Sequence, residues 1–387
     1  MSSSSNTKLN KVTGHRPTWS QIDLEALTSN FNLIKTLVGS AVNVMAVVKA
    51  NAYGHGAVEC ARRLEVAGAD WFGVALPEEG IELRKSGIER PILCLGGFWK
   101  GQEKACLQNN LTPVVYRLEM LDAFDRAAKD AGSVASVHIK IDTGMGRLGI
   151  RSSGVSELCQ ALAKFKNIRV DGLMTHFAAA DDSGLERFTL DQLQAFAEMA
   201  HVFRSYGHQV THQHLANSAA TFALPKARGT MIRPGGALYG LRDTLSPEVD
   251  SSALRPVMSL HSRISLLKWI EAGEPVGYGC TFRATRRTLV GTIPIGYEDG
   301  YRRALSNRGQ TIVKGGYAPV IGRVSMDLSL IDVTDIKSVR VDDAVTLLGS
   351  QDGLTVFAEE MASEVGTISY EITCGISQRV PRVYSSQ

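Results

Sequence analysis

The sequence predicts an α/β fold class, with a (β/α)8 barrel of the TIM type followed by a mainly-β C-terminal domain. Short apolar runs recur eight times within roughly 230 residues, and amphipathic helical patterns separate them, as in a closed barrel. After about residue 250 the helical periodicity fades and apolar residues alternate with polar ones, which indicates a second domain. An open, doubly wound sheet is the alternative arrangement for the first part.

The eight apolar runs are the predicted barrel strands, and they cover 42–48, 71–75, 91–95, 112–116, 136–141, 168–174, 212–215 and 231–233. Two of the intervening helices are predicted from apolar residues spaced three or four apart. The first set is Leu24, Leu27, Phe31, Ile34 and Val38; the second is Leu190, Leu193, Ala197, Ala200 and Phe203, with a stop at Gly207. An alanine-rich helix follows the turn at 53–56 and ends near Gly68.

The second domain is predicted from alternation and from closely spaced turn signals. Its clearest alternating set is Val324, Met326, Leu328 and Leu330, which is typical of a half-buried strand. Turn signals lie at 274–275, 299–300, 315–316 and 352–353. We therefore expect a disordered tail over 1–14, the cofactor-binding barrel over 15–249 and the β domain over 250–387, with a linker near 247–252. The segment 16–22 is a candidate to pair with the C-terminal domain.

Composition narrows the class of protein. Hydrophobic residues make up 44% of the chain and charged residues 21%, as in a soluble globular protein. The net charge of +3 has no basic cluster, which argues against nucleic acid or an anionic membrane as partner. No window approaches the ~20 apolar residues of a membrane helix, and the serine-rich start lacks the apolar core of a signal peptide. Six scattered cysteines indicate buried thiols in a reducing compartment, so we expect a cytoplasmic enzyme.

Polar residues close several of the predicted strands. In chain order they are Lys49, Lys140, His176, Asn217 with Ser218, and Arg233 with Gly235 and Gly236. In a (β/α)8 barrel the strand ends share one face, so reactive groups gather there. A lysine directly after a buried strand is desolvated, which lowers its pKa and favours the nucleophilic amine that imine formation requires. Lys49 is the residue that this argument supports most strongly.

A phosphate site is expected where the loops after the seventh and eighth strands meet. Ser218 offers a hydroxyl, and Gly235-Gly236 lets backbone N–H groups approach an anion without a Cβ in the way. Each feature alone has an ordinary structural explanation, because most glycine pairs are turns and a serine often caps a helix. No metal-ligand spacing surrounds any of the nine histidines, so no metal is expected.

Several ordered segments resemble the alanine racemase family, and together they span nearly the whole chain. Residues 46–56 (AVVKANAYGHG) resemble the family's cofactor-lysine signature, and residues 140–149 (KIDTGMGRLG) resemble a second signature. The further matches, in the family's order, are His176, the segments 214–218 and 233–236, Tyr278 within 277–279, the segments 296–301 and 322–327, Tyr370 and the segment 379–382.

The resemblance implies an alanine racemase that interconverts L- and D-alanine with pyridoxal 5′-phosphate as cofactor. Lys49 would carry the cofactor as a Schiff base and act as one base, and Tyr278 of the partner subunit in a homodimer would be the other. The implied cofactor-binding residues are Lys49, Tyr53, His176, Asn217, Ser218, Arg233, Gly235, Gly236 and Tyr370. The substrate carboxylate would be held by Arg147 and by the partner subunit's Met326.

The resemblance also implies supporting roles. Lys140 matches a lysine that the family carries as a carbamate, which would position Arg147. His214 would support Arg233, His176 would support Tyr278, and Asp327 would belong to the same outer layer. The biological context would be D-alanine for cell-wall peptidoglycan.

The chemistry explains these residue types. Racemisation removes a proton from Cα on one face and returns one on the other, so two bases on opposite faces are the minimal solution. Pyridoxal phosphate makes Cα acidic by delocalising the carbanion. An arginine beside the pyridine nitrogen leaves that nitrogen unprotonated, which limits side reactions. A tyrosine acts as a base only if its pKa of ~10 is lowered or its proton is relayed, and Arg147 and His176 are the candidate agents.

Some alternatives stay open at the level of sequence. Ser325 stands where family members often have cysteine, so the substrate is alanine, serine or a broader set of amino acids. Pro234 also removes one backbone N–H near the expected phosphate. Other function classes are a non-catalytic pyridoxal-phosphate carrier, an amino-acid decarboxylase and a cofactor-free Schiff-base aldolase. The second domain with Tyr278 favours a racemase, because a carrier needs no second base.

Overall fold

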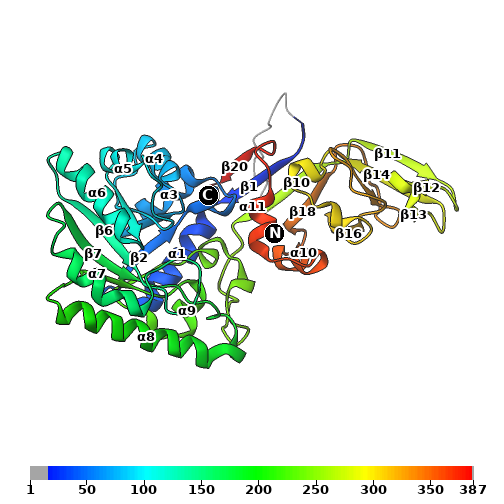
Figure 1. The fold of residues 1–387 in the computed structure, drawn as a ribbon. Coiled ribbons are helices and arrows are strands. Elements are labelled where there is room, and N and C mark those ends of the chain that lie inside the picture. Colours follow the sequence, from blue (N-terminus) through cyan, green and yellow to red (C-terminus); the bar gives the residue numbers. More distant parts are fainter. Residues whose placement is uncertain (1–15, 386–387) are drawn as a thin grey trace, which may run out of the picture. The chain divides into compact units, whose positions relative to one another are not determined.

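The computed structural model describes residues 16–385, which form two units (Figure 1). The larger unit contains residues 22–258, 368–374 and 384–385, and the smaller contains 16–21, 259–367 and 375–383. The tail predicted over 1–14 lies outside the described residues. Across 16–385, no helix combines the length and the apolar character that a membrane crossing needs.

The larger unit is built on eight parallel strands, and the predicted (β/α)8 barrel is confirmed. They are β2 (Asn43–Val47), β3 (Trp71–Val74), β4 (Ile92–Cys94), β5 (Leu111–Val115), β6 (Ala135–Lys140), β7 (Ile168–Met174), β8 (His212–His214) and β9 (Met231–Ile232), in the order β8-β7-β6-β5-β4-β3-β2-β9. The ends of this order meet, because Thr230 N donates to Gln213 O and Arg233 N donates to Ala216 O, both at 2.9 Å. The open, doubly wound alternative is thereby excluded.

Helices surround the strands of this unit (Figure 1). They are α1 (Leu24–Val38), α2 (Lys49–Tyr53), α3 (Ala57–Ala67), α4 (Pro77–Lys85), α5 (Glu103–Gln108), α6 (Leu118–Asp130), α7 (Val155–Leu162), α8 (Glu186–Ser205) and α9 (Ser218–Ala223). α1 begins where Asp23 Oδ1 accepts from Ala26 N at 2.8 Å, and it buries the predicted face at Leu24, Leu27, Phe31 and Ile34. α3 ends at Gly68, whose φ of 98° suits a left-handed helix terminus.

α8 exists where a helix was predicted, but its predicted buried face is partly wrong. Leu190 and Ala197 are exposed, whereas Phe196 and the polar Gln192 are buried. Burial of Gln192 is tolerated because both polar groups of its side chain make hydrogen bonds. Its Oε1 accepts from Ala178 N at 3.0 Å, and its Nε2 donates to the backbone oxygen of His176 at 3.2 Å.

The smaller unit is mainly β, as predicted. Its strands are β10 (Met258–Arg263), β11 (Leu266–Ile270), β12 (Pro275–Val276), β13 (Phe282–Arg283), β14 (Thr288–Ile293), β15 (Gln310–Val313), β16 (Gly316–Pro319), β17 (Ser329–Asp332), β18 (Ala344–Gln351), β19 (Leu354–Val356) and β20 (Arg382–Ser385), with helix α10 (Ala358–Val365). The last helix, α11 (Ser369–Gly375), belongs to the larger unit except for its final residue. One sheet has the order β16-β15-β18-β10-β1-β20, in which β1 is Trp19–Asp23. A second sheet, β11-β14-β17, packs around Ile270, Val276, Val290 and Ile321.

The strand predicted from the alternation over 324–330 is wrong in its first half, since only Ser329–Asp332 is extended in a sheet. Ser325 N instead donates to Leu328 O at 2.9 Å and closes a turn. The turn points Met326 and Leu328 outward, where they are 50% and 46% exposed. The alternation of apolar and polar residues therefore corresponds to an exposed loop rather than to a half-buried strand.

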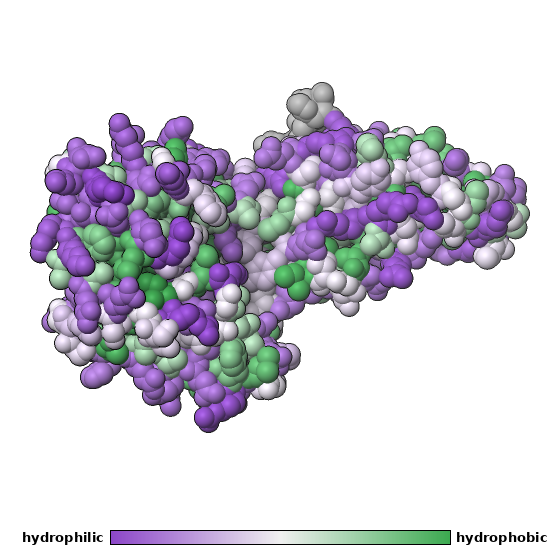
Figure 2. Space-filling view, in the orientation of Figure 1, coloured by the Kyte–Doolittle hydropathy of each residue, from purple (hydrophilic) through white to green (hydrophobic). Residues whose placement is uncertain are grey.

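The surface and the cysteines add two details. On the face drawn in Figure 2, hydrophilic residues predominate and apolar ones are scattered in separate patches. All six cysteines are free thiols, and four of them are buried. Cys280 and Cys374 are exposed, so the expectation that every thiol is buried is wrong for these two.

Candidate active site

A cavity of about 380 Å³ lies at the carboxyl ends of the barrel strands. The predicted residues that line it are Lys49, Tyr53, Lys140, Arg147, His176, Asn217, Ser218, Arg233, Gly235 and Tyr370. Several of them lie at a strand end or within three residues of one, because apolar strand residues fill the barrel interior and the segment beyond each strand reaches the open face. Gly236 and His214 lie behind this lining, next to Tyr370 and Arg233 respectively.

The cavity is strongly cationic. Among the described residues that line it, Lys49, Lys140, Arg147 and Arg233 are basic and none is a carboxylate. Burial lowers the pKa of Lys49, and Arg147 adds to this, whereas Glu79 and Cys374 oppose it. Burial and the neighbouring cations lower the pKa of Lys140 to about 8. The cavity therefore favours an anionic ligand and holds amines with a raised neutral fraction.

One wall of the cavity is a cradle for an anion. Ser218 Oγ accepts from Gly235 N at 3.0 Å and from Ala237 N at 3.2 Å. A Cβ on Gly235 would lie 2.4 Å from Tyr53 Oη, and one on Gly236 would lie 2.6 Å from Tyr370 Oη. The glycine pair is therefore required for the close approach of backbone and hydroxyls.

The tyrosines of the cradle are held protonated. Burial raises the pKa of Tyr370 to about 12, and burial also raises the pKa of Tyr53. Tyr370 lies on α11, which is fixed to the barrel because Asp243 accepts from Ser369 N at 2.9 Å and from Ser369 Oγ. Both phenols are thus positioned hydrogen-bond donors.

Arg233 is buried and is held by uncharged groups. Its Nη atoms donate to the backbone oxygens of Thr175, His214 and Leu215 at 2.5–3.0 Å. They also contact His214 Nδ1 at 3.1 Å and His176 Nδ1 at 3.4 Å. Burial lowers the pKa of Arg233 to about 9, and burial beside Arg233 lowers the pKa of both histidines. The histidines are therefore neutral acceptors, and the guanidinium is fixed without a carboxylate among these contacts.

Three further residues shape the site without having been predicted from sequence. Thr244 lines the cavity, and its Cγ2 would lie 2.5 Å from a Cβ on Gly236. Gln192 braces the backbone of His176 from α8. Glu79 lies beside Lys49 and is hydrogen-bonded to the backbone that follows it. These three residues lie far in the sequence from the residues that they contact, so only the three-dimensional structure identifies them.

Asn217 was predicted to bind the cofactor. Its side chain caps α9, since Oδ1 accepts from Ala220 N at 3.0 Å.

The remaining predicted residues belong to the smaller unit, where three loops lie against one another. A Cβ on Gly277, the residue before Tyr278, would lie 3.4 Å from Arg323 N, so the loops that contain these two residues pass close to each other. Tyr297 N and Glu298 N donate to the backbone oxygens of Ser325 and Met326 at 3.0 and 3.1 Å. On these loops Tyr278 is 72% exposed and Met326 is 50% exposed. The three loops present an aromatic and apolar group to the outside.

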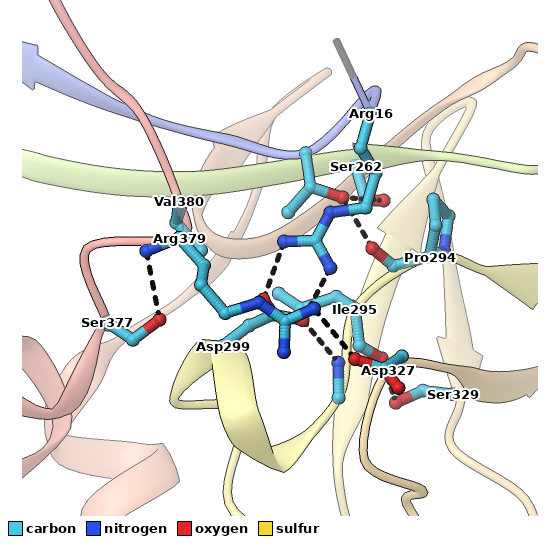
Figure 3. A network of polar contacts seen from close by, with 12 residues as sticks. Arg16, Ser262, Pro294, Ile295, Asp299, Asp327, Ser329, Ser377, Arg379 and Val380 are labelled. Atoms are coloured by element: carbon cyan, nitrogen blue, oxygen red, sulfur yellow. Dashed lines mark hydrogen bonds and ion pairs between the residues drawn. The ribbon is translucent and has the colours of Figure 1, made fainter.

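An ion cluster around the buried Asp299 anchors two of these loops, 296–301 and 322–327 (Figure 3). Asp299 is fully buried, and Arg16 donates to both of its carboxylate oxygens at 2.5 and 2.9 Å. Arg379 lies 3.6 Å from Asp299 and donates to Asp327 at 2.7 Å. Gly296 N completes the coordination of Asp299 at 3.0 Å. The predicted Asp327 thus ties the Met326 turn to the domain core through Arg379.

These features define a class of protein, namely a barrel enzyme in which a desolvated lysine faces an anion cradle. The family models for the N-terminal and C-terminal domains of alanine racemase match residues 22–243 and 257–384. The chain therefore belongs to the alanine racemase family, which are pyridoxal-phosphate-dependent isomerases, and the family resemblance found in the sequence is confirmed.

Named relatives agree across the full length. The chain is 46% identical over 372 residues to the alanine racemase of Geobacter sulfurreducens, covering 95% of this chain and 97% of that one. The solved structure of alanine racemase from Bacillus anthracis with bound L-Ala-P matches with a TM-score of 0.87 and 34% identity, covering 96% of each chain. That of Bartonella henselae with covalently bound pyridoxal phosphate matches with a TM-score of 0.85 and 28% identity, covering 95% and 99%.

Proposed function

We propose that this enzyme racemises alanine with pyridoxal 5′-phosphate held in the barrel cavity, and that Lys49 and Tyr278 are its two bases. One observation carries the proposal. Lys49 follows a buried strand into a cationic cavity that the residues of the glycine and hydroxyl cradle also line. The pyridoxal phosphate bound covalently to the Bartonella henselae relative supports the cofactor.

The residues of the cavity fit this cofactor group by group. The cradle of Ser218, Gly235, Gly236, Tyr53 and Tyr370 would hold the phosphate, because its hydroxyls and N–H groups converge where no Cβ fits. Pro234 contributes no N–H there, and the N–H groups of Gly235 and Ala237 fix the Ser218 hydroxyl, since both donate to its Oγ.

Arg233 would face the pyridine nitrogen, and Lys49 Nζ would bind the aldehyde carbon. His176 and Asn217 would complete the pocket walls. When bound, the cofactor supplies the electron sink that makes the substrate Cα acidic.

The chain's own residues then handle the proton and the carboxylate. The lowered pKa of Lys49 makes its amine a base at Cα on one face. The phenol of Tyr278 acts on the other face, and Arg147 and Met326 N–H orient the carboxylate. Burial beside Arg233 lowers the pKa of His176, so its ring stays neutral and serves as a hydrogen-bond acceptor rather than as a proton acceptor.

Lys140 is proposed to carry a carbamate. Its pKa of about 8 leaves more neutral amine at physiological pH than an ordinary lysine has, and the neutral amine is the form that captures carbon dioxide. The resulting anion would lie among three cations and offset their mutual repulsion. It would orient Arg147, which lies seven residues further along the same loop.

The active enzyme is proposed to be a homodimer with shared sites in the cytoplasm. Exposure of Tyr278 and Met326 on anchored loops supports the dimer, because a base has to be enclosed to act on a bound substrate. Six free thiols are in keeping with a reducing compartment. The product D-alanine would serve cell-wall synthesis.

The test is a turnover assay on purified enzyme with chiral analysis of the products. L-alanine, L-serine and a set of bulkier amino acids are offered separately, with and without added pyridoxal phosphate. We expect D-alanine to form fastest and the reverse reaction to reach the same 1:1 mixture. Failure to racemise any amino acid when loaded with cofactor would overturn the proposal, and a preference for serine would correct the substrate.

A further inference from the structure

The backbone that follows Lys49 has an unusual conformation. Ala50, Asn51, Ala52 and Tyr53 have φ values of 52–54°, so four consecutive residues with side chains form a left-handed turn. For L-amino acids this conformation is disfavoured, because it brings Cβ too close to the following carbonyl oxygen. Such a turn persists only where neighbouring groups hold it in place. It matters here because Lys49 precedes it and Tyr53, a member of the cradle, ends it.

Glu79 on α4 is the charged group that holds the start of this turn. Its Oε1 accepts from Ala50 N at 2.7 Å. Its Oε2 accepts from Ala75 N at 2.7 Å and from Leu76 N at 3.3 Å. One carboxylate therefore joins the residue after Lys49 to the segment that follows β3. Hydrogen bonds to a charged acceptor are about twice as strong as those between neutral groups.

The rest of the turn is held by other contacts. Asn51 Oδ1 accepts from Ala57 N at 2.8 Å, and the buried ring of His55 lies 2.9 Å from Ala52 O. α11 closes the far side, since a Cβ on Gly54 would lie 2.2 Å from Thr373 O. Among these contacts, the bond from Ala50 N to Glu79 is the one adjacent to Lys49. Glu79 does not line the cavity, so its hydrogen bonds reach Lys49 only through the backbone, and its charge in addition opposes the lowering of the Lys49 pKa.

We propose that Glu79 is a positioning residue for Lys49, because its carboxylate holds the left-handed turn that sets both Lys49 and the Tyr53 hydroxyl. The inference rests on the proposed role of Lys49 in holding the cofactor. A glutamine at position 79 keeps one oxygen acceptor, but its NH2 group would point toward a backbone N–H. One of the two segments that Glu79 joins, at Ala50 or at 75–76, would then lose its hydrogen bond. The cofactor would then be held less firmly and in a less defined orientation.

The test compares Glu79→Gln with Glu78→Gln in the full-length enzyme. Glu78 is the neighbouring exposed glutamate, and its carboxylate accepts only from Gln102 Nε2 among the bonds described for it. The measurements are the Kd of pyridoxal phosphate for the apo-enzyme, the visible circular dichroism per bound cofactor, kcat and the unfolding temperature. For Glu79→Gln we expect a Kd and a kcat each worse by roughly tenfold, with weaker visible circular dichroism. Glu78→Gln should stay within about twofold of the parent on every count.

A second variant tests the route through the backbone. Glycine adopts positive φ without penalty, and Ala50 is exposed, so Ala50→Gly leaves no cavity. Adding Ala50→Gly to Glu79→Gln should recover part of the lost affinity and circular dichroism. If Glu79→Gln does not fold, Glu79→Asp keeps the charge but is one methylene shorter, and it should show the same losses in part.

Two results would overturn the inference. One is a Glu79→Gln or Glu79→Asp enzyme that unfolds at a lower temperature yet keeps the parent's Kd, circular dichroism and kcat, since Glu79 would then only cap α4. The other is a double variant with no recovery. A wrong assignment of Lys49 would be recognised by a different result. In that case Lys49→Ala, in an otherwise parental enzyme, would keep the visible absorption band of the bound cofactor.

Discussion

Lys49 in the barrel and Tyr278 in the smaller unit, the two proposed bases, have opposite surroundings. Lys49 lies in a cavity whose walls come from its own unit, and burial lowers its pKa. Tyr278 is 72% exposed, on a loop beside the exposed Met326. Both regions are firmly anchored. Arg233 is held by backbone oxygens in the barrel, and Asp299 is held by two arginines in the smaller unit.

The difference shows that a region can be held in place by polar contacts without enclosing its functional side chains. The barrel encloses its own polar groups, so it contains what cofactor binding requires. The smaller unit fixes the loops 296–301 and 322–327 through the ion cluster around the buried Asp299 but leaves Tyr278 and Met326 exposed. Exposed aromatic and methionine side chains on a fixed surface are typical of a site that a second subunit covers. Variants in the two regions should therefore fail in different ways.

The largest effect is expected at the barrel base. Lys49→Ala should lose the visible absorption of bound cofactor and lower racemisation by ~10³-fold or more, because it removes both the attachment point and a base. Absorption after dialysis against pyridoxal phosphate and chiral chromatography measure the two losses. Lys164→Ala, at an exposed lysine, is the matched control. Full turnover by Lys49→Ala without added amine would refute the role.

Tyr278→Phe should separate the two regions. We expect unchanged cofactor affinity and absorption, because no barrel group is altered, with racemisation lower by ~10²–10⁴-fold through loss of one base. Tyr317→Phe removes the hydroxyl of another exposed tyrosine of the smaller unit, which donates to Thr355 O, and it should stay near parental activity. Parental activity in Tyr278→Phe would remove Tyr278 from the reaction.

Lys140 gives a pH-dependent prediction for the barrel site. Its pKa is lowered to about 8, so its neutral form, and with it carbamate formation, should increase as the pH rises through that value. Lys140→Ala should lower kcat by up to ~10²-fold, since Arg147 loses its support, and chloride should restore part of it. Carbon-13 NMR of enzyme equilibrated with labelled bicarbonate reports the carbamate. A plain ammonium in the fully active enzyme would contradict the assignment.

The smallest effect on activity is expected in the ion cluster of the smaller unit. Asp299→Asn leaves Arg16 and Arg379 without their buried carboxylate and should cost about 3–5 kcal/mol in the free energy of unfolding. Asp335→Asn removes an exposed partner of Arg286 and should cost about 0–1 kcal/mol. Urea unfolding measures both. Cofactor absorption should persist in folded Asp299→Asn, and equal stabilities for the two variants would show that the cluster does not anchor the loops.

Much of the barrel could be predicted because one signal repeats. Several strands are apolar runs that end near a polar residue, and the strand ends of a barrel share a face, so the sequence alone predicts that Lys49, His176 and Arg233 lie together. The resemblance to a family then supplied Tyr278 and Met326, which no spacing argument reaches.

Other features depend on contacts between distant segments and leave no local signal. Gln192 is polar on the buried face of α8 because it bonds to the backbone of 176 and 178. Glu79 lies 30 residues from Lys49, and nothing in its own segment indicates the turn that it holds. The alternation over 324–330 misled because an exposed turn that presents apolar groups has the same pattern as a strand.

The most direct test of the central claim, that two subunits share each active site, mixes Lys49→Ala subunits with Tyr278→Phe subunits. Both variants are first shown to be folded, dimeric and inactive alone. With random exchange at a 1:1 ratio, half of the dimers are mixed, and each mixed dimer has one intact and one doubly altered site. The account predicts that activity returns to roughly a quarter of the parental value per site. If the subunits demonstrably exchange and no activity returns, Tyr278 acts within its own chain and the shared-site account is wrong.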